Sequence, residues 1–129
     1  MTFKSKYKPY LKYHRVVTLV IVFSIIAFTY KYSHSPNAYN NGQIKSYGQT
    51  VNGYNTGRWV WYYENGNKQM EGEFNKGKRE GTWKIYDWHG NIQSISVYTN
   101  DKLNGWQTIY KENKIHRKIL FKNDVIISN

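Results

Sequence analysis

Residues 57–80 read GRWVWYYENGNKQMEGEFNKGKRE, and residues 81–104 read GTWKIYDWHGNIQSISVYTNDKLN. The two stretches align without a gap, and their first glycine, their tryptophan and their tyrosine fall in register. A third stretch, GWQTIYKENKIHRKILFKND over residues 105–124, keeps the same order with one residue missing at its centre. A period of 24 residues across successive units indicates a repeat protein, in which each unit needs its neighbours to bury a face.

The repeat extends upstream of these three units. Asn41-Gly42 lies 24 residues before Asn65-Gly66, and Gly48 and Gly53 lie 24 residues before Gly72 and Gly77. Residues 41–56 are therefore interpreted as the second half of an earlier unit. The first half of that unit, near residues 33–40, has lost the pattern.

Each unit has the pattern of a β-hairpin. The first segment, G-x-W-x-W/I-Y, alternates rings with other residues, as a strand with one buried face does. Asn65-Gly66 is a strong hairpin signal, and a type I′ turn with positive φ at both central residues is expected there. Second strands are predicted at 68–74 and 92–98, and further turns at 75–78 and 99–102. Residues 125–127 are expected to form a last strand that covers the open end.

Glycines begin all three units, at positions 57, 81 and 105. We expect them where two backbones approach closely or where the chain needs a positive φ. The fold class predicted for residues 41–127 is all-β: an antiparallel meander of hairpin repeats, with the partial unit 41–56 followed by the units 57–80, 81–104 and 105–124.

The N-terminus differs from the array in charge and hydropathy. The chain has 129 residues and a formal net charge of +11, and residues 1–31 contain six Lys or Arg and no acid. Residues 16–30, VVTLVIVFSIIAFTY, contain no charge. We interpret 1–15 as a basic cytoplasmic tail, 16–30 as a transmembrane signal anchor and 31–40 as a tether. The excess of basic residues before the run then places the array outside the cytoplasm. The alternatives are export after signal-peptide cleavage, or a buried segment of a soluble domain.

The words G-x-W-x-x-Y-Y-x-N-G and E-G-x-F/Y-x-x-G-x-x-x-G-x-W in residues 41–124 resemble the MORN repeat, in its bacterial variant. The unit 57–80 matches best, 81–104 replaces two glycines by Ser96 and Asp101, and 105–124 has Gln107 in place of Trp. The resemblance implies an elongated, curved sheet of hairpins without chemistry of its own. It also implies contacts with proteins, self-association or phospholipid, and the bacterial variant is often associated with antitoxin or immunity proteins.

No motif in the sequence indicates catalysis, a cofactor or a metal. There is no cysteine, no H-x-x-x-H spacing, no nucleophile elbow and no phosphate-binding loop. Asp87 and His89 are the nearest approach to an acid–base pair, and beside a turn they are expected to be solvated. We therefore expect a protein that is not an enzyme.

Two groups of residues remain as candidate binding sites. The candidates for binding a protein partner, with a toxin as one case, are Trp59, Trp61, Trp83, Trp88 and Trp106. The candidates for anionic lipid or another anionic partner are Lys76, Lys78, Arg79, Lys84, Lys114, Arg117 and Lys118. Nucleic-acid binding is disfavoured, because the predicted anchor places these residues outside the cytoplasm and the rings are needed by the repeat. The leading hypothesis is a membrane-anchored protein-binding module, and the alternative is a self-associating scaffold on a lipid surface.

Overall fold

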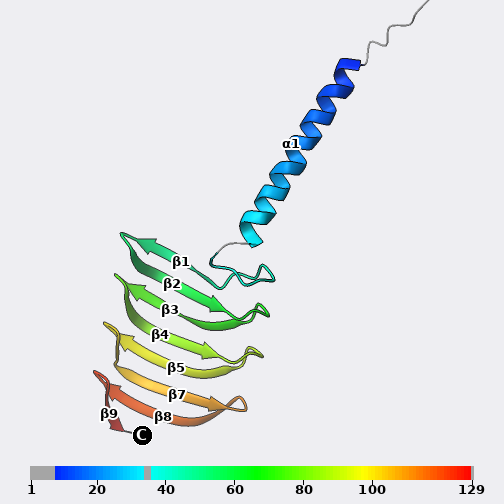
Figure 1. Cartoon of the computed structure of the whole chain (residues 1–129). Coiled ribbons are helices and arrows are strands. Elements are labelled where there is room, and N and C mark those ends of the chain that lie inside the picture. Colours follow the sequence, from blue (N-terminus) through cyan, green and yellow to red (C-terminus); the bar gives the residue numbers. More distant parts are fainter. Residues whose placement is uncertain (1–7, 34–35, 129) are drawn as a thin grey trace, which may run out of the picture.

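A computed structural model describes residues 8–33 and 36–128 of the chain. Residues 1–7 of the predicted tail and 34–35 of the predicted tether lie outside these ranges. Within the ranges, helix α1 (Lys8–Ser33) is followed by nine strands in a single sheet (Figure 1). The strands are β1 (Ser46–Val51), β2 (Tyr54–Tyr62), β3 (Lys68–Asn75), β4 (Lys78–Tyr86), β5 (Ile92–Thr99), β6 (Lys102–Leu103), β7 (Gly105–Lys111), β8 (Lys114–Lys122) and β9 (Val125–Ser128).

The sheet is an antiparallel meander. Its order is β1-β2-β3-β4-β5-β7-β8-β9, and the short β6 pairs with β5 just before β7 continues the same path. Each strand therefore pairs with its neighbours in the chain, and Figure 1 shows the hairpins stacked as a ladder. This confirms the predicted meander of hairpins, and β3, β5 and β9 lie where strands were expected.

Two kinds of turn alternate along the ladder. Two-residue loops with positive φ at both positions join β1 to β2 and β3 to β4, at Asn52-Gly53 (50° and 80°) and Lys76-Gly77 (48° and 81°). At Asn65-Gly66 only Gly66 has a positive φ, 86°, so the type I′ turn predicted there is wrong. The Asn65 side chain explains the difference, because its Oδ1 accepts the N–H of Asn67 (3.0 Å) and fixes a three-residue loop.

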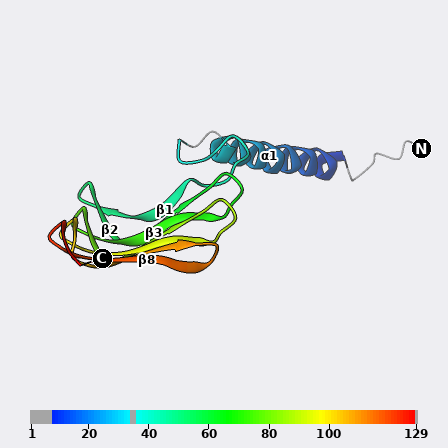
Figure 2. The same ribbon diagram turned by 90° about the horizontal axis from the view of Figure 1, so that it is seen from below.

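Gly57 and Gly81 mark the bends in the strands. Their φ values are 66° and 68°, and a Cβ added at either would have open space around it. The backbone conformation therefore requires glycine at these positions, and close packing does not. The register of the sheet shifts beside both residues, between Tyr47 and Gln49 on β1 and between Glu71 and Glu73 on β3. Figure 2 shows the resulting curvature of the sheet.

The sheet has little closed core. In the described residues it forms a single layer, and the buried hydrophobic residues are Val60, Trp83 and Ile119. Most of the other rings stay partly accessible to solvent. Stability therefore depends on contacts along the ladder between successive hairpins, as in other repeat architectures.

The ladder begins earlier than the sequence pattern indicated. Tyr39 donates its hydroxyl to the carbonyl of Tyr62 (3.0 Å), as Tyr63 does to the carbonyl of Tyr86 (2.9 Å), 24 residues further along. Asn37 pairs with Ser46 through both its amide nitrogen and its oxygen. The start of the array is thus bonded to β1 and β2 from residue 37 onward.

Residues 16–30 are helical, and α1 extends beyond them at both ends. No helix in the described ranges is long and apolar enough to cross a membrane, so the transmembrane element of the predicted fold class is not supported. The physical reason is length: an uncharged run of 15 residues rises about 22 Å, against about 30 Å of hydrocarbon. The helix leads away from the β1 end of the sheet (Figure 2).

Candidate partner-binding surface

Five rings form one connected cluster on a face of β2–β5. We call the side that carries Trp59, Trp61, Phe74, Trp83 and Tyr98 the aromatic face. Phe74 lies edge-on to Trp83 with 5.0 Å between ring centroids, and Trp61 lies 5.8 Å from Trp83. Tyr98 extends the cluster to β5 at 6.2 Å from Trp83. Such aromatic pairs each contribute about 0.5–1.5 kcal/mol beyond their burial, so the cluster is held in a fixed arrangement.

Two tryptophans lie flat on glycines of the preceding strand. The Trp59 ring covers Gly48 and the Trp83 ring covers Gly72, and a Cβ added at either glycine would lie 2.1 or 2.2 Å from the ring. Each indole also donates its Nε1–H to a backbone carbonyl, Trp83 to that of Glu73 (3.2 Å). These glycines are needed for space, in contrast to Gly57 and Gly81.

The structure brings three of the five predicted tryptophans together. Trp59, Trp61 and Trp83 share the aromatic face, and Trp83 is only 4% exposed. Trp88 is 49% exposed in the β4–β5 turn, where it packs on Tyr63 at 5.2 Å. Trp106 is 48% exposed and lies on the other face of the sheet, since its neighbour Gln107 points to the aromatic face. The accessible candidates are thus spread over both faces and one turn.

A polar cluster occupies the opposite face of β2–β4. Glu71 accepts hydrogen bonds from Arg58 (2.6 Å), Lys68 (3.0 Å) and the Tyr86 hydroxyl (2.5 Å). Burial alone would raise the pKa of Glu71, but these three hydrogen bonds outweigh it and lower the pKa to about 2. Burial and the bond to Glu71 raise the pKa of Tyr86 to about 12. The carboxylate therefore stays ionised and acts as a structural anchor for three strands.

The sequence gave only a weak indication of this cluster. Glu71 and Glu73 were expected to form ordinary cross-strand pairs, whereas Glu71 collects two cations and a phenol. The one available signal was the period itself, because Tyr86 is the counterpart of Tyr62 and so follows a strand end. A groove of about 280 Å³ lies beside the cluster and includes Arg58, Glu73 and Lys84 in its lining.

The predicted basic residues do not form one site. Arg79 pairs with Asp101 (3.0 Å) and lies 4.0 Å over the Tyr98 ring, so it is a structural link between two units. Lys76 and Lys78 belong to the β3–β4 turn. Lys84 lines the groove on β4, whereas Lys114, Arg117 and Lys118 all belong to β8 and are exposed.

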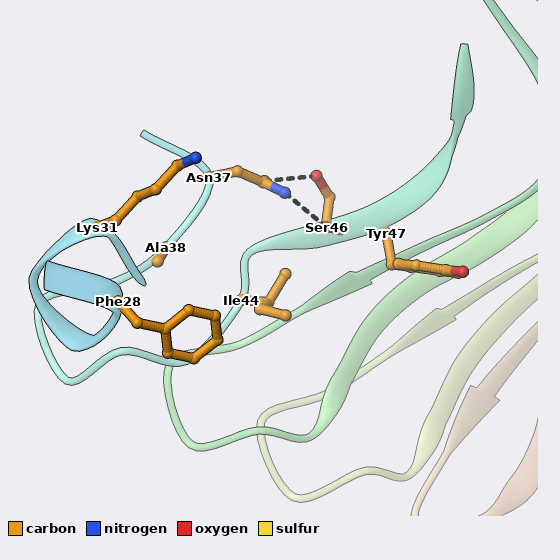
Figure 3. A pocket seen from close by; sticks show the side chains of 7 residues that line it. All are labelled: Phe28, Lys31, Asn37, Ala38, Ile44, Ser46 and Tyr47. Atoms are coloured by element: carbon orange, nitrogen blue, oxygen red, sulfur yellow. Dashed lines mark hydrogen bonds between the residues drawn. The ribbon is translucent and has the colours of Figure 1, made fainter. Parts of the chain in front are cut away.

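A cavity of about 450 Å³ lies between α1 and β1 (Figure 3). Phe28 and Lys31 of the helix line one side, and Ile44, Ser46 and Tyr47 line the other. The hydrogen bonds between Asn37 and Ser46 close one edge. Sequence reasoning missed this cavity, because it depends on how the helix end meets the first hairpin.

Asp87 serves the β4–β5 turn. Its carboxylate accepts the backbone N–H groups of His89 (2.9 Å) and Asn91 (2.8 Å) and the side-chain amide of Asn91. The Asn91 side chain, followed by the backbone bonds, lowers the pKa of Asp87. The carboxylate thus caps a loop, and its contact with His89 runs through the backbone of that residue. Among the described side chains, no three His, Asp or Glu residues gather as a metal site would require.

Comparison with known proteins does not name this chain. No protein-family model matches it, and no curated protein matches its sequence.

Proposed function

We propose that the array is a non-enzymatic module that binds a protein partner through its aromatic face. The observation that carries the proposal is the single layer of the sheet, which leaves a fixed cluster of half-exposed rings with no covering layer in the described chain. Contiguous accessible apolar surface of this kind marks interaction sites in soluble domains, and Trp and Tyr carry most of the binding energy at interfaces.

Membership in the MORN family is part of this proposal. The residues that carry the resemblance have defined roles in the sheet: Gly57 sits at a bend, Gly72 lies under a tryptophan and Gly77 forms a two-residue turn. These roles support a repeat in which spacing and glycine positions are fixed by geometry. An antitoxin or immunity protein, with a toxin as its partner, is one case of the proposed binding module.

We further propose that α1 holds the module at a lipid surface. The helix is apolar on all sides between residues 16 and 30, and its apolar side chains are exposed, Phe23 at 74%. A helix that is hydrophobic all round is stable only when an apolar phase covers it. The proposal requires lipid contact alone. The orientation predicted from the flanking charges stays a prediction, which protease accessibility in intact cells tests.

The binding proposal is tested with the full chain carrying a C-terminal tag, in detergent extracts of the cells that produce it. A captured protein is purified separately, and its affinity is measured by calorimetry for the wild type, Trp61→Ala and Trp88→Ala. We expect Trp61→Ala to weaken binding at least tenfold, since loss of an interface anchor costs about 2 kcal/mol or more. Ile115→Ala, at an exposed apolar residue of β8, is the matched control.

Two results would overturn the proposal. One is a captured protein whose affinity is unchanged in both tryptophan variants while circular dichroism shows the sheet intact. The other is the absence of any saturable protein ligand. Lipid contact is tested separately by flotation of the full chain with vesicles, in which replacement of Phe23 and Leu19 by Asp should leave the protein at the bottom of the gradient.

A further inference from the structure

The last two strands carry basic residues without acidic partners. We call Lys111, Lys114, Arg117, Lys118 and Lys122, on β7 and β8, the terminal basic strip. The salt bridges among the described side chains involve Arg58, Lys68 and Arg79, so the strip takes part in none of them. Lys111 pairs directly across from Lys114, an arrangement in which like charges repel.

The acids nearest in sequence do not neutralise the strip. Glu112 lies in the β7–β8 turn, and Asp124 lies in the β8–β9 turn. The Asp124 carboxylate accepts the backbone N–H of Leu103 at 2.7 Å. The strip thus presents an excess of positive charge at the end of the array.

Beside the strip, the sheet ends in an unprotected edge. β9 pairs with β8 on one side, and no strand in the described chain pairs with its other side. Its apolar residues are exposed: Val125 at 62%, Ile126 at 55% and Ile127 at 57%. Natural proteins guard such edges with charges, proline or a covering segment, and β9 (VIIS) has none of these.

The two ends of the sheet differ in this respect. β1 reads SYGQTV, and the segment before it is bonded to it through Asn37. Its neighbourhood carries the single cation Lys45 and the end of α1. The β9 edge combines an apolar strand with a cluster of cations, and β1 does not.

Side chains on one face of the strip converge toward the edge. Lys118 and Lys122 point to the same side of β8 because they are four residues apart in a strand, and Lys122 pairs with Val125. Trp106 shares this side and is half exposed, opposite Leu120. A strand added to β9 would lie about 10 Å from β8, a distance that lysine and glutamate side chains reaching toward each other can span.

We propose that the β9 edge binds an extended acidic segment of a protein partner, which adds to the sheet as a tenth strand antiparallel or parallel to β9. Backbone groups of the edge supply the pairing, the apolar residues of β9 contact alternate side chains of the segment, and the terminal basic strip selects acidic residues between them. The inference rests on the proposed protein-binding function and assigns the chemistry of the partner.

The test uses the full chain in mild detergent and two capped, fluorescent peptides, one of alternating valine and glutamate and one of alternating valine and lysine. We expect the acidic peptide to bind at least tenfold more tightly and its affinity to fall as salt rises. Hydrogen exchange should show new protection of the β9 amides. Lys118→Glu combined with Lys122→Glu should weaken binding about tenfold.

Matched variants separate the edge from general charge. Lys76→Glu with Lys78→Glu makes the same charge change at the β3–β4 turn and should leave binding unaltered. Ile127→Pro, which removes one N–H from the edge strand, should abolish the protection of β9. Trp61→Ala should leave peptide binding intact, so failure here and failure of the aromatic-face proposal give different results.

Four outcomes would overturn the inference: no binding of the acidic peptide up to 1 mM, equal loss in the turn variant, binding without protection of β9, or association with phosphatidylglycerol vesicles that the peptide does not displace. The last would assign the strip to a lipid surface. A dimer that forms without peptide and hides β9 would assign the edge to a second copy of this chain.

Discussion

Replacement of Gly72 by alanine tests the main packing rule of the sheet. The added methyl would lie 2.2 Å from Cδ2 of Trp83 and would force the indole off the strand. Trp83 is 4% exposed and contacts the rings of Phe74, Trp61 and Tyr98. Expelling a buried tryptophan forfeits most of what its truncation would, about 3–5 kcal/mol. We expect Gly72→Ala to lower the free energy of unfolding by that amount.

Gly57→Ala is the matched control. It adds the same methyl in the same repeat, where no atom lies within 4 Å of the new Cβ. The cost there comes from the backbone alone, because φ is 66°, and amounts to about 1–2 kcal/mol. Guanidinium unfolding of the full chain in detergent, followed by tryptophan fluorescence and circular dichroism, measures both variants. A Gly72→Ala variant no less stable than Gly57→Ala would refute the reasoning.

The third unit supplies a rescue. There Gln107 takes the place of Trp83, and Ser96 takes the place of Gly72, with the Gln107 amide donating to the Ser96 hydroxyl at 3.1 Å. Gly72→Ser alone should cost as much as Gly72→Ala. Combined with Trp83→Gln, it should cost less than the sum of the two single changes, with a coupling of about 1–3 kcal/mol. Additive losses would show that the two positions do not pack as a pair.

Three further predictions concern single interactions. Lowering the pH from 4.5 toward 2 should remove about 1–3 kcal/mol of stability, because the pKa of Glu71 is near 2 in the folded chain and 4.5 otherwise; Glu71→Gln should be flat over this window in acid titrations of unfolding. Glu112→Gly should raise the unfolding midpoint by about 0.5–1 kcal/mol, since φ is 51° at this non-glycine turn residue, and an unchanged midpoint would contradict it. Tyr63→Phe should cost about 1 kcal/mol in the same unfolding assay by removing the bond to the Tyr86 carbonyl.

The sequence was sufficient to predict the order of the strands, because the meander follows from turn chemistry repeated at a fixed period. It was insufficient for the turn types. Asn52-Gly53 and Asn65-Gly66 are identical pairs, yet only the first adopts positive φ at both residues. The difference comes from the next hairpin, since Asn65 donates its side-chain amide to the carbonyl of Trp88 (2.8 Å). A contact across 23 residues decided a conformation that local propensity had assigned differently.

The candidate site was predictable in part for a related reason. A period shows which residues are equivalent, and so it grouped Trp59 with Trp83, but it does not show what covers a ring. Trp88 and Trp106 were expected beside the others and are separate, because one falls in a turn and the other on the opposite face. The role of Glu71 depended on side chains from three strands, which no pattern within one unit contains.

The glycines show why the repeat tolerates change at one end. Gly48 and Gly72 are bound to the tryptophans above them, so neither partner can change alone. In the last unit both partners differ together, as Ser96 and Gln107, and the strands still pair. Once the large ring is absent there, side chains on β8 need not build an aromatic layer, and cations occupy exposed positions instead. The loss of the repeat pattern at this end is therefore the change that makes room for the terminal basic strip beside the open edge.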